Sequence, residues 1–126
     1  LVATAAAQGA AFIGLSPLHA LRMDRADLAS PYSPSSRLAL NPLFIDVTAM
    51  PEFLRSAPAQ ALYADGAFQQ RLEALRGAEA VQYADVAAAK EEMLALLWEE
   101  FRQGDWKTLS PRGVAFQAFL QEHDAT

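Results

Sequence analysis

One tyrosine in this chain stands in a setting suited to binding a ring-shaped polar ligand. Tyr32 lies between Pro31 and Pro34, and serine hydroxyls flank it on both sides, that of Ser30 among them. A sugar has an apolar C–H face and a rim of hydroxyls, and a tyrosine offers an apolar ring face and one hydroxyl. The prolines stiffen the backbone, so less entropy is lost on binding. On these residues alone, a loop tyrosine that covers the core is the favoured interpretation, and a carbohydrate contact at Tyr32 is the alternative.

Polar side chains also border this loop on either side. His19 follows Pro17-Leu18 directly after an apolar run, and a polar residue at the end of a barrel strand is placed for substrate. It suits either a sugar contact or a structural histidine. Asn41 is predicted to hydrogen-bond the loop backbone, with a substrate contact as the alternative. Asp46 is predicted to cap the following turn through Thr48.

The sequence contains no pattern typical of a metal site or of a complete catalytic machinery. It has no cysteine, which excludes a disulfide framework and a thiolate zinc site. The adjacent pairs Glu91-Glu92 and Glu99-Glu100 diverge within each pair on a helix, so they are predicted to form its exposed face. Motifs of the glycine-rich phosphate loop, GxSxG and HExxH types are missing. We expect neither a metal ion nor a cofactor, and we assign no catalytic residue.

Composition limits the class of protein and its partners. The chain has 126 residues, of which 52% are hydrophobic, so we expect one domain at most, with a packed core. A net charge of −5 argues against a nucleic-acid partner. The apolar opening over residues 1–15 lacks a basic region and is too short to span a bilayer, so we predict no signal peptide and no membrane helix. The absence of cysteine fits a cytoplasmic protein.

The N-terminal elements resemble half of a βα repeat. Residues 1–8 are predicted to be the last turns of a helix, because alanine is the best helix former, and Gly9 is predicted to end it. The apolar run over residues 11–15 is predicted to be a buried strand. Helix, glycine and strand in this order are typical of a (β/α) barrel, although a doubly wound sheet has the same local pattern.

A long connection follows this predicted strand. Residues 16–42 hold four of the seven prolines, which fix the backbone and remove hydrogen-bond donors, so this segment is predicted to be loop or extended chain. One helical turn over residues 35–40 is an option inside it. Residues 43–47 are predicted to form a second strand or extended segment.

The rest of the chain has a helical pattern. Asp85 and the pair Ser110-Pro111 are predicted helix starts, and Gly77 and Gly104 are predicted helix ends. Trp98, Phe101 and Trp106 are predicted to be core or packing aromatics and not a binding platform. The predicted helices cover residues 51–55, 57–63, 66–76, about 86–103 and 111–123. The fold class is therefore mainly α, with one or two short strands.

Three segments in order resemble one enzyme family. They are FIGLSPLHAL at residues 12–21, SPYSPSSR at residues 30–37 and LNPLFIDV at residues 40–47. Together they resemble the 4-alpha-glucanotransferases, also called amylomaltases or disproportionating enzymes, of glycoside hydrolase family 77. A weaker similarity continues to the last helix, and Ser16 stands where that family usually has asparagine.

The resemblance implies a (β/α)8 barrel that transfers α-1,4-glucan segments between maltooligosaccharides. The implied chemistry is retaining, with two carboxyl groups about 5 Å apart. It also implies that Tyr32 packs against the glucose at the cleavage subsite, that Ser30 and Pro31 line this subsite, and that His19 and Asn41 are further candidate substrate contacts. In the family the catalytic carboxylates lie well downstream of this region, and none of the fifteen acids of this chain matches them.

We therefore expect a fragment of such an enzyme. Residues 1–48 would be a barrel helix end, a strand and an active-site loop, and residues 49–126 a helical insertion subdomain and a barrel helix. The start and stop within helical patterns suggest cuts through a larger protein. We expect the isolated chain to be inactive and to self-associate through its unpaired strand edge and apolar surface. The alternative is a free-standing helical interaction module without catalysis, which the helices after residue 50 favour.

Overall fold

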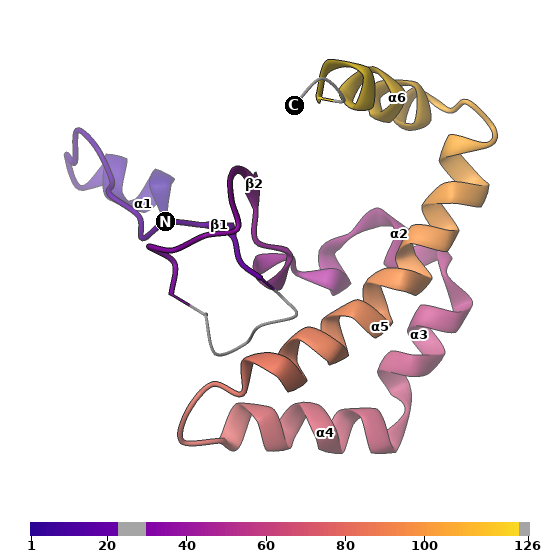
Figure 1. Cartoon of the computed structure of the whole chain (residues 1–126), viewed down its shortest axis with the longest axis horizontal. Coiled ribbons are helices and arrows are strands. Elements are labelled where there is room, and N and C mark those ends of the chain that lie inside the picture. Colours follow the sequence, from indigo (N-terminus) through magenta and orange to yellow (C-terminus); the bar gives the residue numbers. More distant parts are fainter. Residues whose placement is uncertain (23–29, 124–126) are drawn as a thin grey trace. The chain divides into compact units, whose positions relative to one another are not determined.

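A computed structural model describes residues 1–22 and 30–123, so residues 23–29 of the predicted loop lie outside the described part. The chain divides into two compact units, Leu1–Phe44 and Ile45–Thr126 (Figure 1). Helix predominates, and the sheet in the described part has two strands. The prediction of a mainly α chain with one or two short strands is confirmed, while the barrel stays an implication of the resemblance.

The first helix ends where the sequence predicts, but the strand after it is absent. α1 (Val2–Ala7) is followed by Gly9, whose N–H donates to the carbonyl of Ala6 at 3.0 Å. Gly9 has a φ of 83°, a left-handed conformation that glycine adopts without steric cost. The predicted strand over residues 11–15 is wrong: Phe12 is 88% exposed, and no described segment pairs with this run. Strand backbone needs a paired neighbour, whatever its composition.

The two strands of unit 1 come from the long connection. β1 (His19–Ala20) pairs antiparallel with β2 (Ser36–Leu40) in an irregular register. Beside β2, the N–H and the hydroxyl of Ser35 both donate to the carbonyl of Ala20, at 2.9 and 3.0 Å. The helical turn considered for residues 35–40 is therefore wrong, because pairing with β1 draws this segment into a ladder.

A 3₁₀ turn, η2 (Pro42–Phe44), stands where a second strand was predicted to begin. Just before it, Oδ1 of Asn41 accepts the N–H of Leu43 at 2.9 Å. A side-chain acceptor of this kind offers the backbone an alternative to a strand ladder. The strand predicted for residues 43–47 is wrong, and of the extended segment given as its alternative Asp46 has extended backbone, with a φ of −79° and a ψ of 100°. The predicted bond from Asn41 to the loop backbone is confirmed.

A second 3₁₀ turn, η3 (Val47–Ala49), is the first element of unit 2, and the side chain of Asp46 caps its N-terminus. Oδ1 of Asp46 accepts the N–H and the hydroxyl of Thr48, at 3.0 and 2.8 Å. These two bonds, the hydroxyl bond first, lower the pKa of Asp46. The predicted cap from Asp46 is confirmed.

Three short helices of unit 2 follow within a residue of their predicted bounds. Pro51 opens the first of them. Side-chain caps set the starts of the other two: Oγ of Ser56 accepts the N–H of Ala59 at 3.3 Å, and Oδ1 of Asp65 accepts that of Phe68 at 2.9 Å. The helices are α2 (Pro51–Arg55), α3 (Ala57–Ala64) and α4 (Gly66–Gly77).

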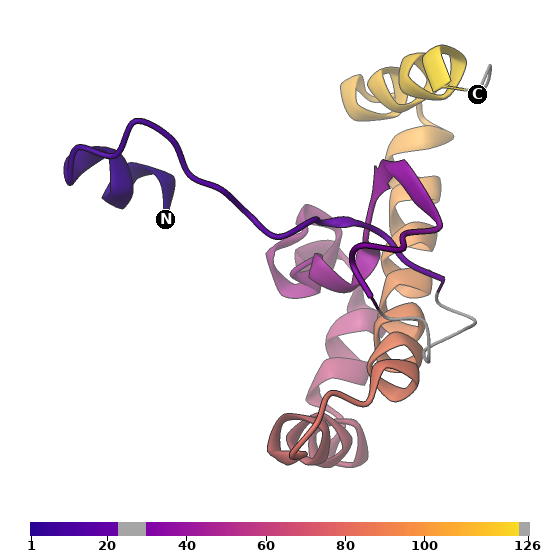
Figure 2. The same ribbon diagram turned by 60° about the vertical axis from the view of Figure 1, so that its left-hand side comes forward.

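The long helix α5 (Tyr83–Phe101) forms the spine of unit 2, and α2, α3 and α4 pack against it (Figures 1 and 2). Asp85 was predicted to start this helix, but it lies inside the first turn, and Gln82 is the N-cap. A carboxylate in the first turn also interacts favourably with the helix dipole. The buried core consists of Ala59, Phe68, Ala89, Met93 and Leu97. Within residues 1–22 and 30–123, no helix is long and apolar enough to cross a membrane.

The end of α5 changes pitch instead of stopping at Gly104. A π-helical turn, η4 (Arg102–Trp106), continues the chain, and α6 (Pro111–His123) begins after a short reversal. Oγ of Ser110 accepts the N–H of Gly113 at 3.2 Å, so the predicted N-cap is confirmed.

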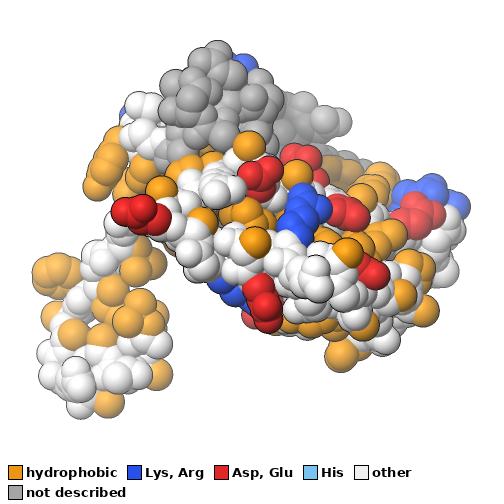
Figure 3. Space-filling model, turned by 90° about the horizontal axis from the view of Figure 1, so that it is seen from below, with side chains coloured by type: hydrophobic (Ala, Val, Ile, Leu, Met, Phe, Trp, Pro, Cys, Tyr) orange, Lys and Arg blue, Asp and Glu red, His pale blue; other side chains and the backbone are white. Residues whose placement is uncertain are grey.

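Aromatic side chains join α5, η4 and α6. Trp98, Phe101 and Trp106 pack with Phe116, with ring centroids 5.3 to 5.7 Å apart. Their predicted role in packing is confirmed. On the face shown in Figure 3, exposed hydrophobic side chains are interspersed with acidic and basic ones.

Candidate functional site

Ser30, Pro31 and Tyr32 form a tight turn in unit 1. The N–H of Ser33 donates to the carbonyl of Ser30 at 3.0 Å, which closes the turn. Pro31 occupies its second position, where the fixed φ of proline suits a turn. The side chain of Tyr32 is 75% exposed. An aromatic ring face and a phenolic hydroxyl are thus accessible on a backbone held by proline and a hydrogen bond.

The β1–β2 ladder connects this turn with Asn41. The carbonyl of Ala20 accepts both hydrogen bonds of Ser35, three residues after Tyr32. The carbonyl of Leu18 accepts the N–H of Asn41 at 2.9 Å. These carbonyls belong to residues two positions apart on extended chain, a span of about 7 Å. The turn and Asn41 are therefore tied to one short stretch of backbone.

His19 and Asn41 differ in how much surface they offer. His19 is half-buried on β1, opposite Leu40 of β2. Asn41 is only 3% exposed, and its Oδ1 is engaged by the N–H of Leu43. The five predicted site residues lie in unit 1, but only Tyr32 presents a large exposed side chain. A ligand contact for each of them stays a prediction.

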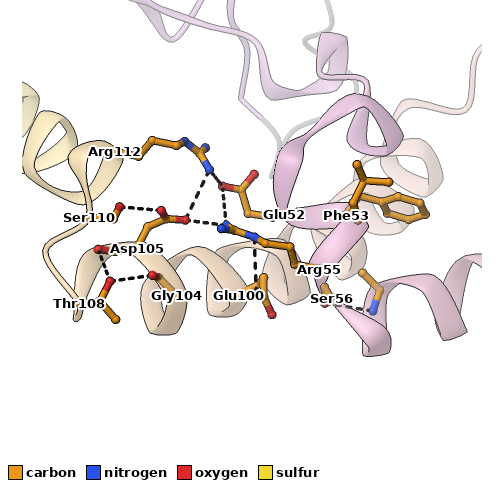
Figure 4. A network of polar contacts seen from close by, with 12 residues as sticks. Glu52, Phe53, Arg55, Ser56, Glu100, Gly104, Asp105, Thr108, Ser110 and Arg112 are labelled. Atoms are coloured by element: carbon orange, nitrogen blue, oxygen red, sulfur yellow. Dashed lines mark hydrogen bonds and ion pairs between the residues drawn. The ribbon is translucent and has the colours of Figure 1, made fainter.

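Unit 2 holds an ionic network around two buried carboxylates, with half-exposed arginines, that the sequence analysis did not predict (Figure 4). Asp105 is 5% exposed, and its carboxylate accepts the hydroxyl of Ser110 and the guanidinium of Arg55, each at 2.6 Å. Ser110 foremost, and then Arg55, lower the pKa of Asp105. The bond to Asp105 raises the pKa of Arg55.

Glu52 extends this network. It is 1% exposed, and its Oε1 lies 2.5 Å from Nη1 of Arg112 and 3.9 Å from Nη2 of Arg55. Among the described residues neither oxygen of Glu52 has a well-aligned hydrogen bond, so its compensation is chiefly coulombic. Arg112 also approaches Asp105, at 3.5 Å. Carboxylates held against guanidinium groups in this way tie helices together.

The signal for this network in the sequence is faint. Glu52 and Arg55 stand three residues apart on one helix, which suggests a local pair. Asp105 lies 50 residues from Arg55, and no local pattern connects the two.

A pocket of about 710 Å³ lies between η3, α3, α4 and α5. Its wall mixes apolar, hydroxyl, cationic and acidic side chains, among them Asp46, Thr48, Leu72, Arg76, Glu79 and Lys90. In the described ranges, 1–22 and 30–123, no three or more His, Cys, Asp or Glu side chains are grouped so that they could hold a metal ion.

Comparison with known proteins agrees with the resemblance seen in the motifs. The sequence pattern of the family described as 4-alpha-glucanotransferase matches residues 1–126. The 4-alpha-glucanotransferase of Haemophilus influenzae is 33% identical over 121 residues, which cover 96% of this chain. The chain spans 17% of the length of that relative. The chain belongs to the 4-alpha-glucanotransferase family, as its motifs predicted.

Proposed function

We propose that this chain is part of an enzyme that transfers α-1,4-glucan segments between maltooligosaccharides by a retaining double displacement. Membership of the family supports the activity. The exposure of Tyr32 on its closed turn is the observation that carries the proposed substrate contact. In the enzyme, residues 1–48 contribute a substrate-binding loop of a (β/α)8 barrel, and residues 49–126 form a helical insertion and a barrel helix.

Tyr32 acts by binding and orienting the reacting sugar. Its ring stacks on the C–H face of the glucose at the cleavage subsite, and its hydroxyl bonds a sugar hydroxyl. Ser30 and Pro31 line the same subsite. Because the turn is closed before substrate arrives, less entropy is lost on binding, and the sugar is held in one orientation for attack. His19 and Asn41 contribute further contacts.

The catalytic carboxylates come from elsewhere in the longer protein. A retaining pair needs two carboxyl groups about 5 Å apart, one of them protonated at the start. In the described residues the buried carboxyl groups are those of Glu52 and Asp105. Both lie against arginine, and the pKa of Asp105 is lowered, which is the wrong direction for a general acid. This supports a catalytic pair outside the chain.

Incubation with maltotriose tests the proposal. We expect the full-length protein to produce glucose together with longer maltodextrins, and the isolated 126-residue chain to produce neither. Transfer by the isolated chain at the rate of the full-length protein would overturn the assignment of the carboxylates. A full-length protein without transfer activity would overturn the activity itself and favour the helical interaction module.

A further inference from the structure

The ladder of unit 1 changes register between two neighbouring residues of β1. His19 is opposite Leu40, but the next residue, Ala20, is opposite Ser36. Residues 37–39 of β2 lie between these two pairs with no residue of β1 opposite them, and we call them the bulge. All three are exposed. A bulge of this kind changes the point along a strand at which pairing resumes.

The hydroxyl of Ser36 satisfies the backbone of the bulge. Oγ of Ser36 accepts the N–H of Leu38 at 3.2 Å and the N–H of Ala39 at 3.3 Å. A serine that bonds backbone two and three residues ahead offers the chain an alternative to a strand ladder. The bulge is thus held by a side chain of its own strand.

The engaged N–H of Ala39 affects what the carbonyl of Ala20 can bind. Two residues before Ala20, the carbonyl of Leu18 accepts the N–H of Asn41 at 2.9 Å. Hydrogen-bonded and non-hydrogen-bonded pairs alternate in a regular antiparallel ladder, so the next hydrogen-bonded pair would join Ala20 to Ala39. In the structure the N–H of Ala39 donates to Ser36 instead, and the carbonyl of Ala20 is left for another donor.

That donor is Ser35, which lies three residues after Tyr32. The carbonyl of Ala20 accepts both the N–H and the hydroxyl of Ser35, at 2.9 and 3.0 Å. In a regular ladder Ala39 would occupy this carbonyl. Ser35, four residues earlier on the strand, would then lie about 13 Å away along extended chain. The register therefore determines whether the turn of Tyr32 is tied to β1.

From this competition we propose that Ser36 is a positioning residue for the turn of Tyr32, acting through the register between β1 and β2. The inference rests on the proposed function, since it assigns Ser36 a role toward the site at Tyr32. Ser36 itself touches no substrate. Without its hydroxyl, the N–H groups of Leu38 and Ala39 lose their acceptor, and the regular ladder gains population at the expense of the bulged one.

The test uses three variants of the full-length enzyme. Ser36→Ala removes the acceptor and Ser36→Thr keeps a hydroxyl. Leu38→Ala is the matched control, because it shortens an exposed side chain of the bulge and leaves the acceptor in place. Two properties are measured: hydrogen exchange of the amides of Ser35 and Ala39, and KM and kcat for maltotriose. If Ser36→Ala does not fold, Ser36→Val, which has the shape of threonine without the hydroxyl, takes its place and is judged by the same results.

Exchange should report the change of register directly. In Ser36→Ala we expect the amide of Ser35 to exchange faster, because it loses the carbonyl of Ala20. The amide of Ala39 should stay protected, because it gains that carbonyl.

KM should rise by about 3- to 10-fold in Ser36→Ala. A protein whose binding-competent state is only partly populated has an apparent affinity reduced by that fraction. We expect a smaller change in kcat, because substrate bound at Tyr32 holds the competent register. Ser36→Thr should recover most of the effects on exchange and KM, and Leu38→Ala should show neither.

Three outcomes would overturn the proposal. Unchanged exchange at Ser35 in Ser36→Ala would show that the hydroxyl does not set the register. Faster exchange at both amides would show a loosened bulge without a change of register. A rise in KM in Leu38→Ala equal to that in Ser36→Ala would place the bulge itself against substrate. Exchange does not depend on catalysis, so a failure of the register mechanism and a failure of the proposed activity are distinguishable.

Discussion

The carboxylate of Asp105 accepts a hydrogen bond from the guanidinium of Arg55 at 2.6 Å, across 50 residues of sequence. This contact joins the end of α2 to η4, the π-helical turn that follows α5. The other oxygen of Asp105 accepts the hydroxyl of Ser110, the N-cap of α6. One buried carboxylate therefore fixes the ends of three helices, and its charge state should control how well unit 2 holds together (Figure 4).

Acid should weaken unit 2. The folded pKa of Asp105 lies below its ordinary value of 3.8, and Arg102 lowers the pKa of Glu99 from 4.5 to about 2. A lowered folded pKa gives stabilisation that is fully present above the unfolded pKa and is lost as the pH falls through the folded one. We expect the urea midpoint to stay constant from about pH 7 to pH 5 and to fall below about pH 4.5. Circular dichroism during urea titrations measures it.

Asp105→Asn should lower the midpoint at pH 7 and flatten its dependence below pH 4.5. The variant loses the charge that Arg55 faces, so protonation no longer removes an ion pair there. Glu73→Gln, which replaces an exposed acid of α4, is the control and should leave both features unchanged. A variant with the wild-type acid slope would show that Asp105 does not govern acid sensitivity.

Gly113→Ala should destabilise the chain. A Cβ at this position would overlap the backbone carbonyl of Asp105, which a flexible side chain cannot relieve. We expect a loss of at least about 1 to 3 kcal/mol in the free energy of unfolding, the usual range for overpacking. Gly77→Ala is the matched control: its Cβ has open space, and we expect it to be neutral or slightly stabilising. Equal midpoints for the two variants would contradict the close approach of α6 to η4.

Tyr32→Ala in the full-length enzyme should lower kcat/KM by about 10- to 100-fold, the effect of losing one stacking and hydrogen-bonding side chain at a reacting sugar. Tyr32→Phe keeps the ring and should lose less. The Tm should stay near the wild-type value, because the side chain is exposed. Leu54→Ala, which truncates an exposed residue of α2, is the control. A Tyr32→Ala protein that unfolds easily but has wild-type kinetics when folded would make Tyr32 structural.

The isolated chain should self-associate at micromolar concentration. Phe12 and Phe44 are exposed large apolar side chains, and Ile13 and Leu43 adjoin them in the sequence. Contiguous apolar surface favours association, so we expect these four residues to become buried against another copy. Sedimentation should show dimers or larger species, and Phe12→Asp should shift them toward monomer, whereas Leu54→Asp in unit 2 should not. A monodisperse monomer at these concentrations would contradict the prediction.

The helices of unit 2 and the irregular chain around Tyr32 followed from the sequence because their signals are local. Ser56, Asp65 and Ser110 accept hydrogen bonds from N–H groups three residues ahead, so each cap is visible within a few positions of the chain. The prolines of residues 16–42 act through their own backbone, so they predicted loop or extended chain there, and the structure closes that loop into a turn at Ser30–Ser33. The three motifs were also enough to indicate the family, which the comparisons confirmed.

Only the tertiary structure decided which segments pair. The apolar run over residues 11–15 has the composition of a strand, but no described segment pairs with it. Ser36–Leu40 is a strand because it pairs with β1. The bond from Arg55 to Asp105 and the bond from Lys90 to Ile45 cross 50 and 45 residues of sequence. Contacts at such separations depend on how whole helices pack, and side chains that meet in this way leave no periodic pattern between them in the sequence.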